Sequence, residues 1–165
     1  MKQIICASLA IISLGLLGVN FAGAIELNDD QKATVSQTCV NAQSNLQRVN
    51  SSDTTTRINR GRNYDQILKL FYLMNTRAAS NNIAEPKLAE TTNRFEAELA
   101  NFRENYNLYN AQLKSTVDFG CSSAPQEFYN QLDRTREKRI VLNENVTRLN
   151  SLIEEYKAII RELTL

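Results

Sequence analysis

Residues 86–120 decide the fold, and they read PKLAETTNRFEAELANFRENYNLYNAQLKSTVDFG. Apolar, aromatic or threonine side chains recur along this stretch at alternating intervals of three and four residues, which is the spacing of one helix face. Pro86 suits the first turn of a helix, and Gly120 suits the residue after its end. We therefore expect one long amphipathic helix. Its inward face comprises Thr92, Phe95, Leu99, Phe102, Tyr106, Tyr109, Leu113 and Thr116.

The residues after 125 predict a second long helix whose inward face repeats every 3.5 residues. That period, held to the end of the chain, is typical of a left-handed coiled-coil seam. The link at 120–125 is so short that the two helices must pack antiparallel. This arrangement brings Leu99 near Val146. The expected seam comprises Phe128, Leu132, Thr135, Arg139, Leu142, Val146, Leu149, Ile153, Tyr156, Ile160 and Leu163.

Two further helices are expected before residue 80. The first begins at residues 28–30, whose Asn and Asp side chains are good helix caps. Residues 50–53 read NSSD, a sequence that favours a break and the start of a new helix at Thr54. The sequence thus predicts an all-α fold, an elongated antiparallel bundle of about four helices with coiled-coil seams.

The composition excludes much of the catalytic repertoire. The chain of 165 residues contains no His and three Cys, so it has no imidazole base, no His-containing zinc site and no Cys₄ site. It also lacks a glycine-rich phosphate loop and a pair of carboxylates placed across a cleft. A net charge of +1 gives no reason to expect nucleic acid as a partner. We expect a non-enzyme with no catalytic residues, no metal and no cofactor.

Residues 1–24 have the pattern of a secretory signal peptide. Lys2 precedes an apolar run at residues 4–19, and Ala22-Gly23-Ala24 is a small-x-small cleavage signature. The apolar run is shorter than the ~20 residues that span a bilayer, so cleavage is expected rather than retention as an anchor. The mature part, residues 25–165, would be a single helical domain without net charge or a transmembrane segment. Its expected location is secreted or periplasmic.

Cys39 and Cys121 are the two cysteines of the mature part. An even, minimal pair in an oxidising compartment favours one structural disulfide. Catalytic or intermolecular thiols are the alternative, although redox-active pairs usually lie close together in sequence.

Arg139 occupies a position of the expected seam where Leu would be typical. Phe102, Tyr106 and Tyr109 lie within about one turn of its expected partner, so the guanidinium can stack on an aromatic ring. One interpretation is a pocket for a small anionic ligand, and the other is a buried polar layer that fixes the register.

Two groups of basic residues stand out, and either could bind phosphate-bearing envelope polymers or lipid headgroups. Solvated faces paired with nearby carboxylates are the alternative. The first group is Arg57, Arg60 and Arg62, and the second is Arg134, Arg136 and Lys138.

One set of segments carries a resemblance to known proteins: Cys39, Asp53 to Arg57 with Gly61 and Tyr64, Asn75 to Arg77, Asn81-Asn82, Cys121 with Pro125 to Tyr129, Arg136 to Arg139, and Leu152 to Tyr156. Together these segments resemble small secreted helical proteins of candidate-phyla bacteria of the Patescibacteria and Saccharibacteria kind. The resemblance implies an exported bacterial protein and transfers no catalytic residues. By size, signal peptide and helical hairpin the chain is also similar to the periplasmic chaperone family called Skp or OmpH, whose members are strongly basic.

The function expected from these features is interaction with a protein or with the cell envelope. A periplasmic holdase-like chaperone and a small anionic-ligand binder are the alternatives. A homo-oligomer stays open as well, because coiled-coil seams serve contacts within and between chains equally well. The segment after Leu149 has an apolar face wide enough for two neighbours, which are either other helices of the chain or a partner.

Overall fold

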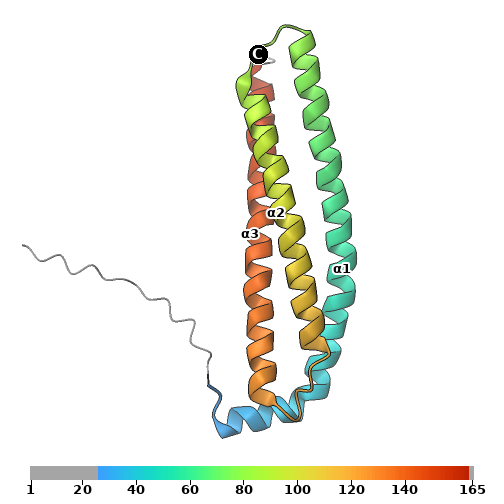
Figure 1. Ribbon diagram of the computed structural model, residues 1–165, viewed down its shortest axis with the longest axis vertical. Helices are drawn as coiled ribbons and strands as arrows, with labels where there is room; N and C mark the ends of the chain where they lie inside the picture. Colours follow the sequence, from blue (N-terminus) through green and yellow to red (C-terminus); the bar gives the residue numbers. More distant parts are fainter. Residues whose placement is uncertain (1–25, 164–165) are drawn as a thin grey trace, which may run out of the picture.

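The computed structural model describes residues 26–163, which form three α-helices. They are α1 (Asp29–Ser80), α2 (Pro86–Val117) and α3 (Pro125–Leu163) (Figure 1). The described residues contain no strand, so the all-α prediction is confirmed. The expectation of about four helices is wrong, because the two helices expected before residue 80 are one. The predicted signal peptide, residues 1–24, lies outside the described residues.

α1 continues through residues 50–53, where the sequence predicts a break. Hydroxyl groups in this region donate to backbone carbonyl oxygens of the preceding turn, so they are satisfied within the helix and do not cap a new one. The donor and acceptor pairs are Ser51 and Gln47 (3.0 Å), Ser52 and Val49 (3.2 Å), and Thr54 and Asn50 (2.8 Å). The cap expected at the start is present, since the Asn28 side chain accepts from the backbone N–H of Gln31 at 2.9 Å.

α2 and α3 pack antiparallel, as the short link between them requires (Figure 1). Side-chain hydrogen bonds across the interface lie within about one turn of the expected alignment. These bonds join Asn145 Nδ2 to Glu98 Oε1 (2.6 Å), Thr91 Oγ1 to Glu155 Oε1 (3.2 Å) and Gln112 Nε2 to Gln131 Oε1 (2.7 Å). α2 buries every residue of its predicted face except Tyr106, which is half-buried.

The expected seam of α3 consists of two lines of residues, each with a spacing of seven, and α3 buries only one of them. The line Phe128, Thr135, Leu142, Leu149 and Tyr156 is buried as predicted. The second line was expected to lie four residues after each member of the first. The residues that are buried instead lie three residues after it, and they are Asn145, Leu152 and Ile159. α2 covers this earlier line. Of the other line, Val146, Ile153 and Ile160 are half-buried, and Arg139 is exposed.

The expectation that Arg139 forms a buried polar layer is therefore wrong. Other residues supply the buried polar groups between α2 and α3. Asn145 is buried, accepts from Asn105 Nδ2 at 2.9 Å and donates to Glu98. The hydroxyl groups of Thr116 and Thr135 lie 2.8 Å apart between α2 and α3. Because a shift in register would leave these buried groups unpaired, they favour one alignment of the hairpin.

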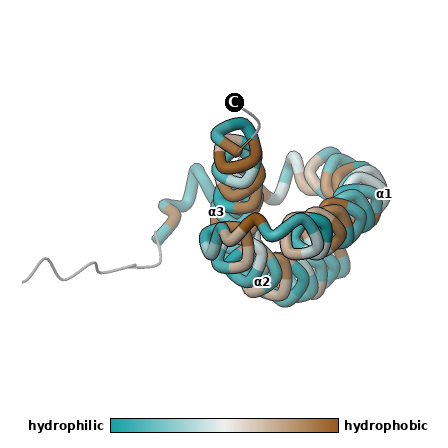
Figure 2. The backbone as a smooth tube through the Cα atoms, turned by 90° about the horizontal axis from the view of Figure 1, so that it is seen from above, coloured by the Kyte–Doolittle hydropathy of each residue, from teal (hydrophilic) through white to brown (hydrophobic). Residues whose placement is uncertain are grey.

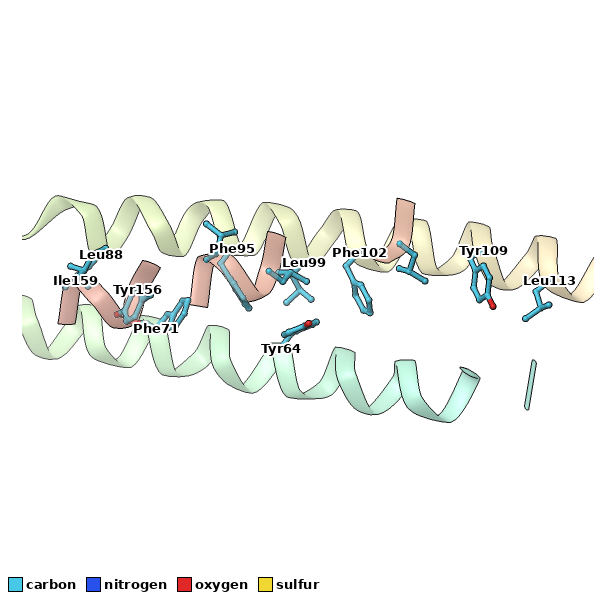
Figure 3. Packing of buried hydrophobic residues seen from close by; sticks show 13 residues of the cluster. Tyr64, Phe71, Leu88, Phe95, Leu99, Phe102, Tyr109, Leu113, Tyr156 and Ile159 are labelled. Carbon is cyan, nitrogen blue, oxygen red and sulfur yellow. The ribbon is translucent and has the colours of Figure 1, made fainter. Parts of the chain in front are cut away.

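α1 packs on the hairpin through aromatic side chains (Figure 3). Tyr64 meets Phe102 edge-on with ring centroids 5.7 Å apart, and Phe71 meets Phe95 at 5.2 Å. Phe71 also stacks on Tyr156 of α3 at 3.7 Å. Seen end on, α1 and α3 lie on either side of α2, and they contact each other much less than each contacts α2 (Figure 2).

The first part of α1 extends past the end of α2, because α1 has 52 residues and α2 has 32. This part runs across the link between α2 and α3 (Figure 1). The predicted disulfide is present there, with the Cα atoms of Cys39 and Cys121 5.5 Å apart. Gln43 Nε2 donates to the backbone oxygen of Phe119 at 2.9 Å. A small apolar cluster that includes Phe128 surrounds the disulfide.

We expect removal of the disulfide to loosen the first part of α1 before the rest of the fold. The bond closes a loop with a sequence separation of 82 residues, and the chain-entropy model gives at most about 4 to 5 kcal/mol for such a loop. In a Cys39→Ser/Cys121→Ser variant, urea unfolding should show a lower free energy of unfolding. Hydrogen exchange should accelerate at residues 29–45 more than at residues 64–74. Equal acceleration in both segments would contradict a local role for the disulfide.

Candidate functional site

Arg57 on α1 is a buried cation, with only 6% of its surface exposed. Its guanidinium carbon lies 4.8 Å from the centroid of the Tyr109 ring on α2, in a cation–π contact. Its Nη2 atom lies 3.6 Å from Oδ2 of Asp53, one turn earlier on α1. This separation allows attraction between the charges but is too long for a good hydrogen bond.

Two nitrogen atoms of Arg57, Nε and Nη1, are buried without a hydrogen-bond partner. Stacking on a ring satisfies the face of a guanidinium, but its N–H donors point outward in the plane. A buried donor left without an acceptor costs about 1–3 kcal/mol, and more when the group is charged. Among residues 26–163, Arg57 is thus the residue whose buried side-chain nitrogen atoms have no hydrogen-bond partner.

Tyr109 links Arg57 to Asp53. Its hydroxyl group donates to Oδ2 of Asp53 at 2.7 Å. Burial, with a further contribution from this hydrogen bond and the Asp53 charge, raises the pKa of Tyr109 to about 12. Arg139 and Arg57 act in the opposite direction, because a nearby cation favours the phenolate. Arg139 therefore influences this cluster through its charge, although its side chain is exposed.

A groove of about 450 Å³ lies beside Arg57 between α1 and α2. It brings together two of the aromatic residues expected near Arg139, Phe102 and Tyr106, with Arg57 and Arg62 of the first basic group. Tyr109 contacts Arg57, whereas Arg139 and Arg60 are outside the groove lining. The lining residues are Arg57, Ile58, Gly61, Arg62, Asp65, Phe102, Arg103, Tyr106 and Asn107.

The second basic group lies on the outside of α3. Arg134 forms an ion pair with Glu127 at 4.0 Å, and Arg136 forms one with Asp133 at 3.8 Å. All four side chains are well exposed, and such pairs contribute ~0–1 kcal/mol. Lys138 is half-buried on the same helix. This arrangement agrees with a solvated, partly neutralised face.

A second groove, of about 360 Å³, lies between α1 and α3 near the C-terminal ends of both helices. Its walls are mainly apolar, and two basic side chains stand among them. The lining residues are Leu70, Phe71, Met74, Tyr156, Lys157, Ile160 and Arg161. Ile160 belongs to the half-buried line of α3, so this groove lies where the expected seam of α3 is incompletely covered.

No family model, curated protein or solved structure matches the chain. The resemblance to secreted proteins of candidate-phyla bacteria therefore stays a prediction. Within residues 26–163 no cluster of three or more metal-binding side chains occurs. No helix in this part of the chain is long and apolar enough to span a membrane.

One signal in the sequence could have identified Arg57 as the buried arginine. Arg57, Tyr64 and Phe71 are seven residues apart and are all buried. A heptad line extended back from the two aromatic residues therefore reaches Arg57. The expected break at residues 50–53 hid this line, because it placed Arg57 in the first turn of a new helix.

We expect Tyr109 to make the stability of the protein depend on pH in the alkaline range. A pKa of about 12 in the folded chain, against about 10 in an unfolded one, means that folding favours the protonated phenol. This contribution is complete below pH 10 and is lost as the pH rises from 10 to 12. The difference in unfolding free energy between wild type and Tyr109→Phe should therefore change across that interval in urea titrations.

Asp53→Asn is the matched background, because it removes the Asp53 charge that helps to raise the pKa of Tyr109. In this background the difference between Tyr and Phe at position 109 should change less between pH 10 and pH 12. A difference for Tyr109→Phe that stays constant over the same interval would contradict the raised pKa of Tyr109.

Proposed function

We propose that this chain is an exported, non-enzymatic helical protein that acts by binding a partner protein, and that the partner binds between α1 and α3. The apolar groove between these helices carries the proposal. The Cys39–Cys121 disulfide and the pattern of residues 1–24 support export, because disulfides persist mainly in oxidising compartments.

The arrangement of the helices supports a helix as the occupant. α1 and α3 both pack on α2 and touch each other little, so a helix laid between them would complete a four-helix bundle. Ile160, which belongs to the half-buried line of α3, lies on one side of the groove. Leu70, of which 56% is exposed, stands on the other. The 3.5-residue period of α3 would then serve a coiled-coil seam with the partner.

The charges at the groove indicate the chemistry of the partner. Lys157 and Arg161 line the groove together with apolar side chains. Lys157 pairs with Glu154 at 2.7 Å, but both side chains are more than half exposed, so this pair is weak and can exchange. An amphipathic helix with an apolar face and flanking Asp or Glu residues is therefore the partner that fits best.

A photo-crosslinking amino acid at position 70 tests this proposal. The modified protein, incubated with envelope extract of the source organism, should form one discrete adduct. The crosslinked peptide should lie in an acidic amphipathic helix of the partner. Position 108 on α2 is the matched control, since Leu108 is also a leucine, with 47% of its surface exposed, and should give no such adduct. Equal labelling from both positions, or none from position 70, would contradict the proposal.

A holdase-like chaperone is the second candidate, and exposed apolar side chains outside the groove favour it. Val40 on α1 is 76% exposed, and Ile140 on α3 is 58% exposed. Such a chaperone would suppress the aggregation of unrelated unfolded proteins at a stoichiometric ratio. Suppression that persists in a Leu70→Glu variant would favour the holdase over a dedicated partner.

A second copy of this chain is the other occupant that the groove could accept. Light scattering on the purified protein distinguishes it. A dimer that dissociates in the Leu70→Glu variant would replace the partner helix by a second copy.

A further inference from the structure

We propose that the groove between α1 and α2 beside Arg57 binds the phosphoryl group of a small organic phosphate. This site is separate from the groove between α1 and α3, and the inference does not depend on the proposed function. It rests on three observations: the unpartnered donors of Arg57, the charge balance of the groove, and the shape of its lining.

Arg57 has buried N–H donors without acceptors in the protein. Nε and Nη1 of Arg57 carry three N–H groups, and all three are buried without an acceptor. Asp53 does not satisfy them, because its Oδ2 atom accepts from the Tyr109 hydroxyl and lies 3.6 Å from Nη2. Oxyanions of phosphate are strong acceptors that form short, charge-assisted bonds with guanidinium groups. A phosphoryl group beside Arg57 would supply the acceptors that the protein itself does not.

The charge balance favours phosphate over a carboxylate. Arg103 forms an ion pair with Asp65, and these two charges cancel in the net charge of the groove. Arg62 is exposed and forms no ion pair among residues 26–163, and Arg57 has only its long contact with Asp53. The groove thus holds two cations that are incompletely neutralised. A phosphate monoester carries about −1.5 to −2 at pH 7 and matches both, whereas a carboxylate matches one.

The remaining lining fits an organic group attached to the phosphate. Ile58, Phe102 and Tyr106 provide apolar and aromatic surface next to the arginines. Gly61 also lines the groove and adds no side chain to it. A volume of about 450 Å³ exceeds what a bare phosphate ion fills. The ligand is therefore a phosphate ester with a planar or apolar portion.

Binding requires a small movement at the rim of the groove. Nε and Nη1 are buried, so a lining residue must shift before phosphate oxygens reach them. Tyr106 is half-buried and lines the groove.

Isothermal titration calorimetry on the oxidised, purified protein tests the proposal with three probes: phenyl phosphate, inorganic phosphate and benzoate. Phenyl phosphate should bind most tightly. Inorganic phosphate lacks the aromatic part and benzoate lacks the second charge, so each should bind about tenfold or more weakly. In parallel, the Nε–H signal of Arg57 in a spectrum of ¹⁵N-labelled arginine should shift on addition of phenyl phosphate.

Three variants locate the site. Arg57→Met should abolish binding and leave the melting temperature equal or higher, because it replaces an unsatisfied buried cation by an apolar side chain of similar length. Arg62→Gln lies on the surface and should weaken binding about tenfold without affecting folding. Arg134→Gln is the matched control, since it removes an exposed arginine of α3, and its affinity should equal that of wild type.

Absence of phenyl phosphate binding at millimolar concentration would overturn the proposal. So would unchanged affinity in Arg62→Gln, a test that holds even if Arg57→Met does not fold. Equal weakening in Arg134→Gln would also overturn it, because it would mark general attraction of anions to basic surface.

Discussion

The antiparallel packing of α2 on α3 is the contact on which the other features of the molecule depend. Leu99, Leu142 and Leu149 are fully buried along it, and paired polar groups such as Thr116 and Thr135 fix its alignment. The short link after Val117 makes this hairpin a local structure, so its two stripes meet at a small entropic cost. α1 then adds to a support that already has a defined shape.

The unequal lengths of the helices explain how α1 attaches. Its later part adds Tyr64 and Phe71 to the core, whereas its first part lies beyond the end of α2. A helix that leaves its support needs another attachment, and the Cys39–Cys121 disulfide supplies one across the link. Because α1 rests mainly on α2, it leaves α3 partly uncovered on the side that faces α1.

The sequence was sufficient to predict the hairpin, its alignment and the disulfide, since the stripes of α2 and α3 are long and regular. Two features could not be predicted from it. Residues 50–53 carry good capping side chains, but in a helix held by tertiary contacts their hydroxyl groups bond back to the preceding turn. A 3.5-residue period also leaves two choices for the second buried line of α3, and only the position of α2 decides between them.

The structure also differs from the prediction in which arginine is buried. Arg139 lies on the line of α3 that is not covered, so it is exposed, while Arg57 lies on a heptad line with Tyr64 and is buried. Tyr109, one of the aromatic residues expected beside Arg139, makes its cation–π contact with Arg57 instead. The candidate site was therefore predictable in its residue types but not in the helix that supplies the cation.

The central claim is that α2 and α3 form the stable support and that α1 is an arm attached to it. Native-state hydrogen exchange over a series of low urea concentrations tests this claim most directly. We predict that residues 55–80 of α1 exchange through a partial opening with a lower free energy than the opening of α2 and α3. The same free energy of opening for all three helices would contradict the claim.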